Sequence, residues 1–153
     1  MIKQIPLWLT PYVIGQANLT YAGEIYTYAI ISAEFSTGKY APANFVIFKD
    51  GVLAISDAYP KEYRELGLIH EIIEPTRDHD DGECLYALKQ ELEMAEQEEG
   101  VNLRKYISFR LAFFNDWVTY YGQKERSPKE SFLLRKLEVS YNHLLSLVEA
   151  PTK

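Results

Sequence analysis

Cysteine is almost absent from this sequence, because Cys84 is the only one among its 153 residues. A single cysteine excludes an intrachain disulfide, a Cys-x-x-Cys redox pair and a zinc site built from several cysteines. A chain of this composition fits a reducing compartment. Free cysteines usually behave as small buried hydrophobes, so Cys84 is predicted to lie in the core rather than to act as a nucleophile.

Long apolar runs are also lacking. No stretch approaches the roughly 18 uninterrupted apolar residues that a transmembrane helix needs. The apolar run from Met1 to Ile14 is broken by Pro6 and Pro11 and contains no small-residue cleavage site. These features predict a cytoplasmic protein without a membrane partner.

Positive charge is in deficit: the formal net charge is −6 and the sequence pI is about 5.1. Nonspecific binding to nucleic acid or to an anionic membrane depends on an excess of Lys and Arg, so neither partner is expected. Motifs that cradle phosphates, dinucleotide fingerprints and Ser nucleophile elbows do not occur, which removes the common nucleotide-binding and α/β-hydrolase functions. Metal ions and neutral or cationic partners stay open.

The sequence does contain enough apolar material for a core. Hydrophobic residues make up 47% and aromatic residues 14% of the chain, which excludes general disorder. At this length the default is one domain, over residues 1–153.

The periodicity predicts an α+β fold: an N-terminal helix, a short β-hairpin and a mainly helical C-terminal half. Polar residues between Asn18 and Phe35 recur at helical steps, which favours a helix, although the Tyr and Ile content suits a strand nearly as well. An Asp-Gly turn, Asp50-Gly51, joins the apolar runs 45–48 and 52–55 and predicts the hairpin.

Four helices are predicted after the hairpin. The first spans about 60–74 and is stopped by Pro75. The next three span about 82–99, 102–121 and 127–149, and the glycines Gly100 and Gly122 are expected to end two of them. The last helix opens with the capping-box sequence 127–130, Ser-Pro-Lys-Glu.

The segment 70–81 concentrates side chains that bind metals. Residues four apart on a helix share a face with Cβ atoms about 5–6 Å apart, so His70 and Glu74 can both reach one ion, with Glu71 beside them. Carboxylates in a last helical turn are disfavoured by the macrodipole, so a positive group is expected near Glu71 and Glu74. A structural alternative is that Asp80 or Asp81 caps the next helix while Arg77 neutralises its neighbours.

The order helix, strand hairpin, helix with His70-Glu71-Ile72-Ile73-Glu74 resembles zincin metallopeptidases, especially their minimal, gluzincin-like members, with HExxE in place of HExxH. The resemblance implies that His70 is a Zn²⁺ ligand and that Glu71 is the base that activates a zinc-bound water. It also implies that the strand 52–55 pairs with an extended peptide substrate.

At the second ligand position Glu74 replaces the family's His, which makes the site more anionic and less Lewis acidic. The third ligand implied by the resemblance is Glu91 on the following helix, with Glu93 next to it, while His79 in the intervening loop is an alternative. The sequence therefore predicts a zincin-like metal-binding protein, either a metal-dependent peptidase or a degenerate descendant of one.

The alternative function is a noncatalytic protein-interaction module or a homodimeric scaffold. Apolar residues of the last predicted helix alternate steps of three and four, the spacing of an interhelical seam. They are Leu134, Leu137, Tyr141, Leu144 and Val148. The seam is expected to pack within the chain by default, with homodimer formation as the second interpretation, and a peptide or protein partner fits either function.

Overall fold

The computed structural model describes residues 5–36, 42–49, 51–74 and 83–149. The chain divides into two compact units, Met1–Ile72 and Ile73–Lys153. The predicted α+β class is confirmed, with the strands in the first unit and three long helices in the second. The prediction of a single domain stays a prediction, because compact units of this size occur both as parts of one domain and as separate domains.

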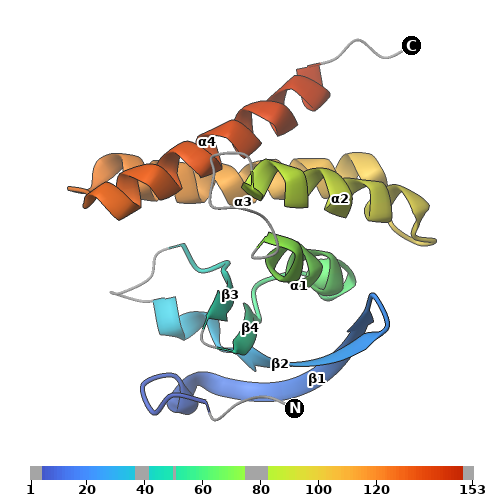
Figure 1. The fold of residues 1–153 in the computed structure, drawn as a ribbon, viewed down its shortest axis with the longest axis vertical. Helices are drawn as coiled ribbons and strands as arrows, with labels where there is room; N and C mark the ends of the chain where they lie inside the picture. Colours follow the sequence, from blue (N-terminus) through green and yellow to red (C-terminus); the bar gives the residue numbers. More distant parts are fainter. Residues whose placement is uncertain (1–4, 37–41, 50, 75–82, 150–153) are drawn as a thin grey trace. The chain divides into compact units, whose positions relative to one another are not determined.

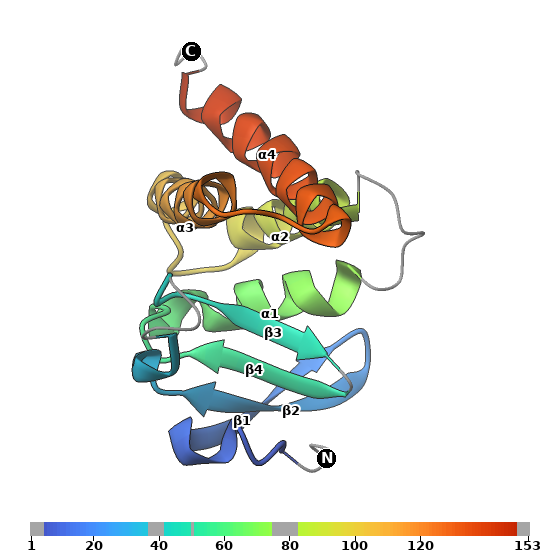
Figure 2. The ribbon, with the colours of Figure 1, turned by 90° about the vertical axis from the view of Figure 1, so that its left-hand side faces the viewer.

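A four-stranded sheet forms most of the first unit (Figures 1 and 2). Its strands are β1 (Val13–Tyr21), β2 (Glu24–Ile31), β3 (Val46–Lys49) and β4 (Val52–Ser56), in the spatial order β1-β2-β4-β3. The pairs β1–β2 and β3–β4 are antiparallel, whereas β2 and β4 run parallel. The sheet is therefore mixed, and β1 and β3 are its edges among the described strands.

The predicted helix over 18–35 is wrong, because this segment forms the end of β1 (residues 18–21), all of β2 and most of a 3-10 turn, η2 (Ala33–Ser36). The strand alternative is correct. Two residues, Ala22 and Gly23, turn the chain with φ of 51° and 81°, values typical of a type I′ hairpin turn. The sequence gives no Asn-Gly or Asp-Gly signal at this turn, because its first residue is Ala22 and alanine seldom adopts positive φ.

The Asp-Gly hairpin is confirmed: β3 and β4 pair from Val46 opposite Ile55 to Lys49 opposite Val52, and Gly51 has φ of 81°. The resemblance implied that strand 52–55 pairs with substrate, and this expectation is wrong. Strand β4 is hydrogen-bonded to β2 on one side and to β3 on the other. Ala54 and Ile55 are paired on both edges, so this part of the strand cannot add a peptide strand.

Helix α1 (Arg64–Ile73) follows a 3-10 turn, η3 (Lys61–Tyr63), and confirms the helix predicted over 60–74. It lies alongside the sheet in both views (Figures 1 and 2). Apolar side chains that are at most 5% exposed form the core of this unit. They include Ala29, Ile31, Leu53, Ile55, Tyr59, Leu66, Leu68 and Ile69.

The second unit contains α2 (Glu83–Gln97), α3 (Leu103–Gln123) and α4 (Pro128–Glu149), close to the predicted bounds. Asn102 caps α3, because its side-chain oxygen accepts the backbone N–H of Lys105 at 3.0 Å. Gly100, with φ of 90°, lies in the connection between α2 and α3. The helix was predicted to end at residue 121, before Gly122, and this is wrong by two residues because α3 continues to Gln123.

The three helices pack on one another, and α4 crosses α2 and α3 in Figure 1. Their core includes Cys84, Leu88, Phe114 and Leu144, with Leu137 and Tyr141 packed against it. Three of the five predicted seam residues of α4, Leu137, Tyr141 and Leu144, thus pack inside their own unit, whereas Val148 is 50% exposed. The homodimer stays a prediction. None of the helices in the described part of the chain has the length and apolar character needed to cross a bilayer.

The predicted capping box at the start of α4 is confirmed. The Glu130 backbone N–H donates to the Ser127 hydroxyl at 3.2 Å, and the Ser127 N–H donates to the Glu130 carboxylate at 3.1 Å.

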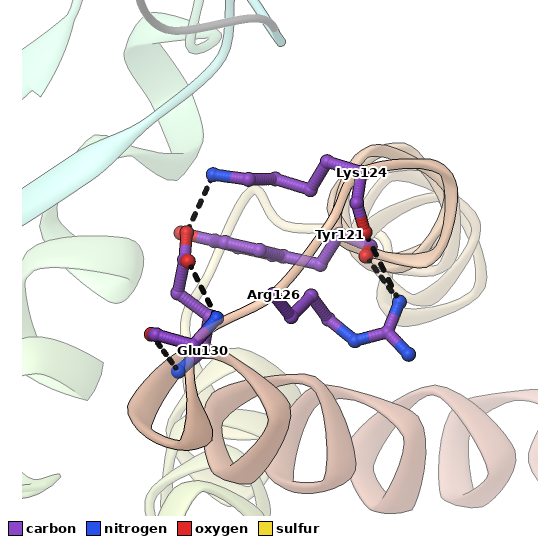
Figure 3. A network of polar contacts seen from close by, with 5 residues as sticks. Tyr121, Lys124, Arg126 and Glu130 are labelled. Atoms are coloured by element: carbon purple, nitrogen blue, oxygen red, sulfur yellow. Dashed lines mark hydrogen bonds and ion pairs between the residues drawn. The ribbon is translucent and has the colours of Figure 1, made fainter.

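Lys124 donates to Glu130 at 2.5 Å, while Arg126 donates to the Tyr121 carbonyl at 2.8 Å (Figure 3). The bond from Lys124 lowers the pKa of Glu130, so its contribution to stability is present at neutral pH and is lost as pH falls through that lowered pKa.

Ser127→Ala should lower the free energy of unfolding by about 0.5–2 kcal/mol, because it leaves an α4 backbone donor without its side-chain partner. Urea denaturation followed by circular dichroism measures the change. Ser108→Ala, at an exposed position inside α3, is the matched control and should be neutral or slightly stabilising. Equal effects of the two substitutions would contradict the capping role.

Candidate metal site

His70 and Glu74 lie one helical turn apart at the C-terminal end of α1. His70 belongs to the last turn of the helix, and Glu74 directly follows Ile73 as a 3-10 residue. Side chains at positions i and i+4 of a continuous helix share a face, so both groups lie on the same side of this helix. His70 is only 3% exposed, which removes its imidazole from bulk water.

The positive group expected near Glu74 is Lys136 on α4. Its Nζ lies 3.2 Å from Glu74 Oε1, and the two side chains are 10% and 17% exposed. A lysine this buried requires an opposite charge, since an unpaired ammonium would be strongly destabilised by desolvation. Lys136 therefore compensates a carboxylate that the helix macrodipole disfavours.

Cys84, near the start of α2, lies beside the same carboxylate. A Glu74 carboxylate oxygen and Cys84 Sγ are within 4.8 Å of each other. The predicted core position of Cys84 is confirmed, because the residue is 3% exposed. Its sulfur accepts a hydrogen bond from the Ser140 hydroxyl at 3.1 Å.

One helix therefore supplies partners to both groups. Lys136 and Ser140 are four residues apart on α4, so they share a face, and both residues are buried. Lys136 contacts Glu74, and Ser140 contacts Cys84. The result is a largely buried polar cluster of Glu74, Cys84, Lys136 and Ser140, of which Cys84 also belongs to the apolar core of the second unit.

The donor types in this region fit zinc. Imidazole nitrogen, carboxylate oxygen and thiolate sulfur bind Zn²⁺ with bonds of about 2.0–2.3 Å, which places tetrahedral ligand atoms roughly 3.3–3.8 Å apart. The separation between Glu74 and Cys84, which is at most 4.8 Å, would have to shrink by at most about 1.5 Å. A change of this size is within reach of side-chain rotation.

The remaining predicted site residues lie in different settings. Glu71 is half-buried on α1, one position after His70 and therefore beside the His70–Glu74 face. His79, together with Arg77, Asp80 and Asp81, lies outside the described residues. The prediction of His79 as third ligand and the structural alternative for the aspartates thus stay predictions.

Glu91 has a different set of contacts from those predicted for it. It is fully buried on α2, where Arg110 Nε lies 2.8 Å from Oε2 and Arg110 Nη2 donates to Oε1 at 3.1 Å. The Tyr106 hydroxyl also donates to Oε2 in a short hydrogen bond. The Arg110 guanidinium lies 4.7 Å from the ring centroids of both Phe113 and Phe114. These contacts favour a structural role for Glu91 over a metal-ligating one.

Cys84, Lys136 and Ser140 were not predicted from the sequence to lie in this region. Cys84 is 14 positions from His70, and Lys136 and Ser140 are more than 60 positions from it. A local motif cannot span such separations. The sequence offered one signal for Lys136. Carboxylates in a last helical turn are disfavoured by the macrodipole, so a cation was expected near Glu74, but the sequence did not indicate which one.

Comparison with known proteins adds no assignment: this chain matches no protein-family model, no curated protein and no solved structure. The arrangement of side chains around Glu74 is therefore the main ground on which a function can be proposed.

Proposed function

We propose that this protein binds a transition-metal ion, zinc by preference, through His70 and Glu74, and that it is zincin-like. The observation that carries the proposal is the position of a buried histidine one turn before a carboxylate that is itself held by Lys136. Carboxylate ligands of metals are commonly fixed by an outer hydrogen bond, which orients the ligand and tunes its basicity. Lys136 supplies a contact of that kind.

The first unit supports the zincin-like part of the proposal. A strand hairpin, β3–β4, leads directly into the helix that bears His70 and Glu71. This order agrees with the resemblance, although two strands stand where the resemblance expected an N-terminal helix. The motif then lies at the end of a helix whose apolar residues Leu66, Leu68 and Ile69 are buried, so the backbone that presents it is well anchored.

Metal analysis of the full chain, purified without chelator, tests the proposal. Wild-type protein should hold about one zinc per chain. His70→Ala should abolish this content, because it removes the nitrogen ligand, while circular dichroism shows the fold retained. His143→Ala on α4 is the matched control, since His143 has no predicted role in the site, and should leave the metal content unchanged. Wild-type protein without metal, even after incubation with Zn²⁺, would disprove the function.

The same preparations separate an active hydrolase from a degenerate one. Zinc-loaded wild-type protein and Glu71→Gln are compared on fluorescently labelled casein. In an active peptidase, Glu71→Gln keeps zinc and loses turnover, because only the base is removed. In a degenerate descendant, wild-type protein binds zinc without cleaving, and Glu74→His restores the ligand set of the resembled family.

A further inference from the structure

The two edges of the sheet in the first unit differ in how they are protected. Edge strands usually are short or carry a charge or a proline, because their unpaired backbone groups can otherwise pair with another chain. Strand β3 has four residues and ends in Lys49, so it is protected. Strand β1 has nine residues, and none of Val13–Tyr21 is charged or a proline. Among the described strands, β1 pairs with β2 alone.

We infer that the outer edge of β1 binds the same edge of a second copy of this chain, antiparallel and about a two-fold axis. The two sheets then join into one continuous sheet, in which neither copy leaves β1 as an open edge. A symmetric pair brings each residue of β1 opposite another residue of the same strand. Because the strand is uncharged, no like charges oppose each other. The interface does not involve the proposed metal ligands.

The hairpin turn between β1 and β2 decides which backbone groups of β1 face outward. Tyr21 and Glu24 flank a two-residue turn, so their backbone groups bond to each other across the hairpin. Along an antiparallel strand, residues alternate between bonding to this partner and facing away from it. The N–H and C=O groups of Gln16, Asn18 and Thr20 therefore point away from β2, and these three residues are exposed.

The regular part of β1 sets the register of the interface. An irregularity near the start of the strand disturbs its pairing with β2, and regular pairing covers Gly15–Tyr21. Asn18 is the middle residue of this stretch. With Asn18 on the two-fold axis, Gln16 lies opposite Thr20 of the second copy, so the outward backbone groups of all three residues find partners. The two Asn18 side chains lie opposite each other and can exchange hydrogen bonds.

On the inner face of the sheet, the same register brings large side chains opposite small ones. Leu19 lies opposite Ala17 of the second copy, and Tyr21 lies opposite Gly15. Leu19 is 3% exposed and already packed in its own core, so a small neighbour fits beside it. Within 4 Å, a Cβ atom added at Gly15 would meet only Ile30 Cδ1. The space over Gly15 can therefore take an aromatic ring from the neighbouring strand.

Two substitutions of Asn18 test the interface in the full chain. Asn18→Pro removes an outward N–H and leaves the pairing with β2 intact, a change that edge strands tolerate. Asn18→Ala is the matched control, because it keeps this N–H. In sedimentation equilibrium, the mass of wild-type protein should rise from 17.7 kDa towards twice this value at micromolar concentrations, since paired edges bury a small interface.

The two variants should differ clearly in the dissociation constant of the dimer. Asn18→Pro should raise it by about 30-fold or more, because each copy loses a hydrogen bond to the other. Asn18→Ala should change it by less than about 10-fold, because only a side-chain pair is lost. Wild-type protein that stays monomeric throughout the micromolar range would overturn the inference. A dimer that Asn18→Pro leaves unchanged would overturn it as well.

Cysteine cross-linking decides if Asn18→Pro fails to fold. Asn18→Cys places two thiols opposite each other with Cα atoms about 5.5 Å apart, which is within the range of a disulfide. Thr27→Cys is the control, because Thr27 pairs with Asn18 on β2 and would lie roughly 14 Å from its copy across the interface. Cys84 is buried and common to both variants. Mild oxidation should cross-link only Asn18→Cys, and equal cross-linking of both variants, or of neither, would overturn the interface.

Discussion

Glu91→Ala is expected to lower the free energy of unfolding by about 3–5 kcal/mol, the cost typical of breaking a buried ion pair from one side. Arg110 is 2% exposed, and its guanidinium pairs with both oxygens of Glu91. Without Glu91, a buried cation and the Tyr106 hydroxyl lose their charged partner. Urea denaturation of the full chain, followed by circular dichroism, measures the loss.

A matched apolar replacement serves as the control for Glu91. The triple variant Glu91→Leu, Tyr106→Phe and Arg110→Met removes all the buried polar partners together and should stay within about 1 kcal/mol of wild type or exceed it, as replaced buried pairs often do. It should also retain the zinc content of wild type, because Glu91 is assigned a structural role. A loss of zinc in this variant would restore Glu91 as a ligand.

Gly67→Ala should destabilise the protein by about 1–2 kcal/mol, although alanine normally stabilises a helix interior relative to glycine by about 1 kcal/mol. A Cβ atom at this position of α1 would lie 2.5 Å from Tyr59 Oη and 2.7 Å from Tyr59 Cζ. The Tyr59 ring is fully buried and cannot swing into solvent. Overpacking of this kind costs about 1–3 kcal/mol, which exceeds the gain in helix propensity.

Gly122→Ala is the matched control for Gly67, because it makes the same change near the end of another helix, α3. An added Cβ at Gly122 meets no atom within 4 Å. The substitution should therefore stabilise the protein by about 0.5–1 kcal/mol through the lower entropy of the unfolded chain. The two glycines should give opposite signs in thermal or urea denaturation, and the same sign at both would contradict the role of Tyr59.

Much of the second unit was predictable from sequence because its signals are local. The capping box at Ser127 lies within one helical turn, and the structure confirms it. The glycines Gly100 and Gly122 and the capping box predicted the bounds of α2, α3 and α4 to within a few residues. The Asp-Gly turn fixed the β3–β4 hairpin for the same reason, since a two-residue turn selects its own pairing.

The error at β1 and β2 arose where local signals conflicted. Polar residues at helical steps favoured a helix, and the turn at Ala22-Gly23 lacks the residue types that usually mark a type I′ turn. The strand conformation is stabilised instead by pairing between distant segments, such as Ala29 opposite Ala54 across β2 and β4. Hydrophobic periodicity is judged over neighbouring residues, so it cannot reveal pairing between segments this far apart in the chain.

The sequence by itself determined the α+β class, the hairpin, the four C-terminal helices and the position of His70 and Glu74 on one helix face, because each depends on contacts within a few residues. Only the tertiary structure decided which groups surround Glu74. Lys136, Ser140 and Cys84 come from helices far apart in the chain, and their meeting depends on how apolar faces pack. The same packing buried Glu91 against Arg110, since a charge in a core must find its counterion there.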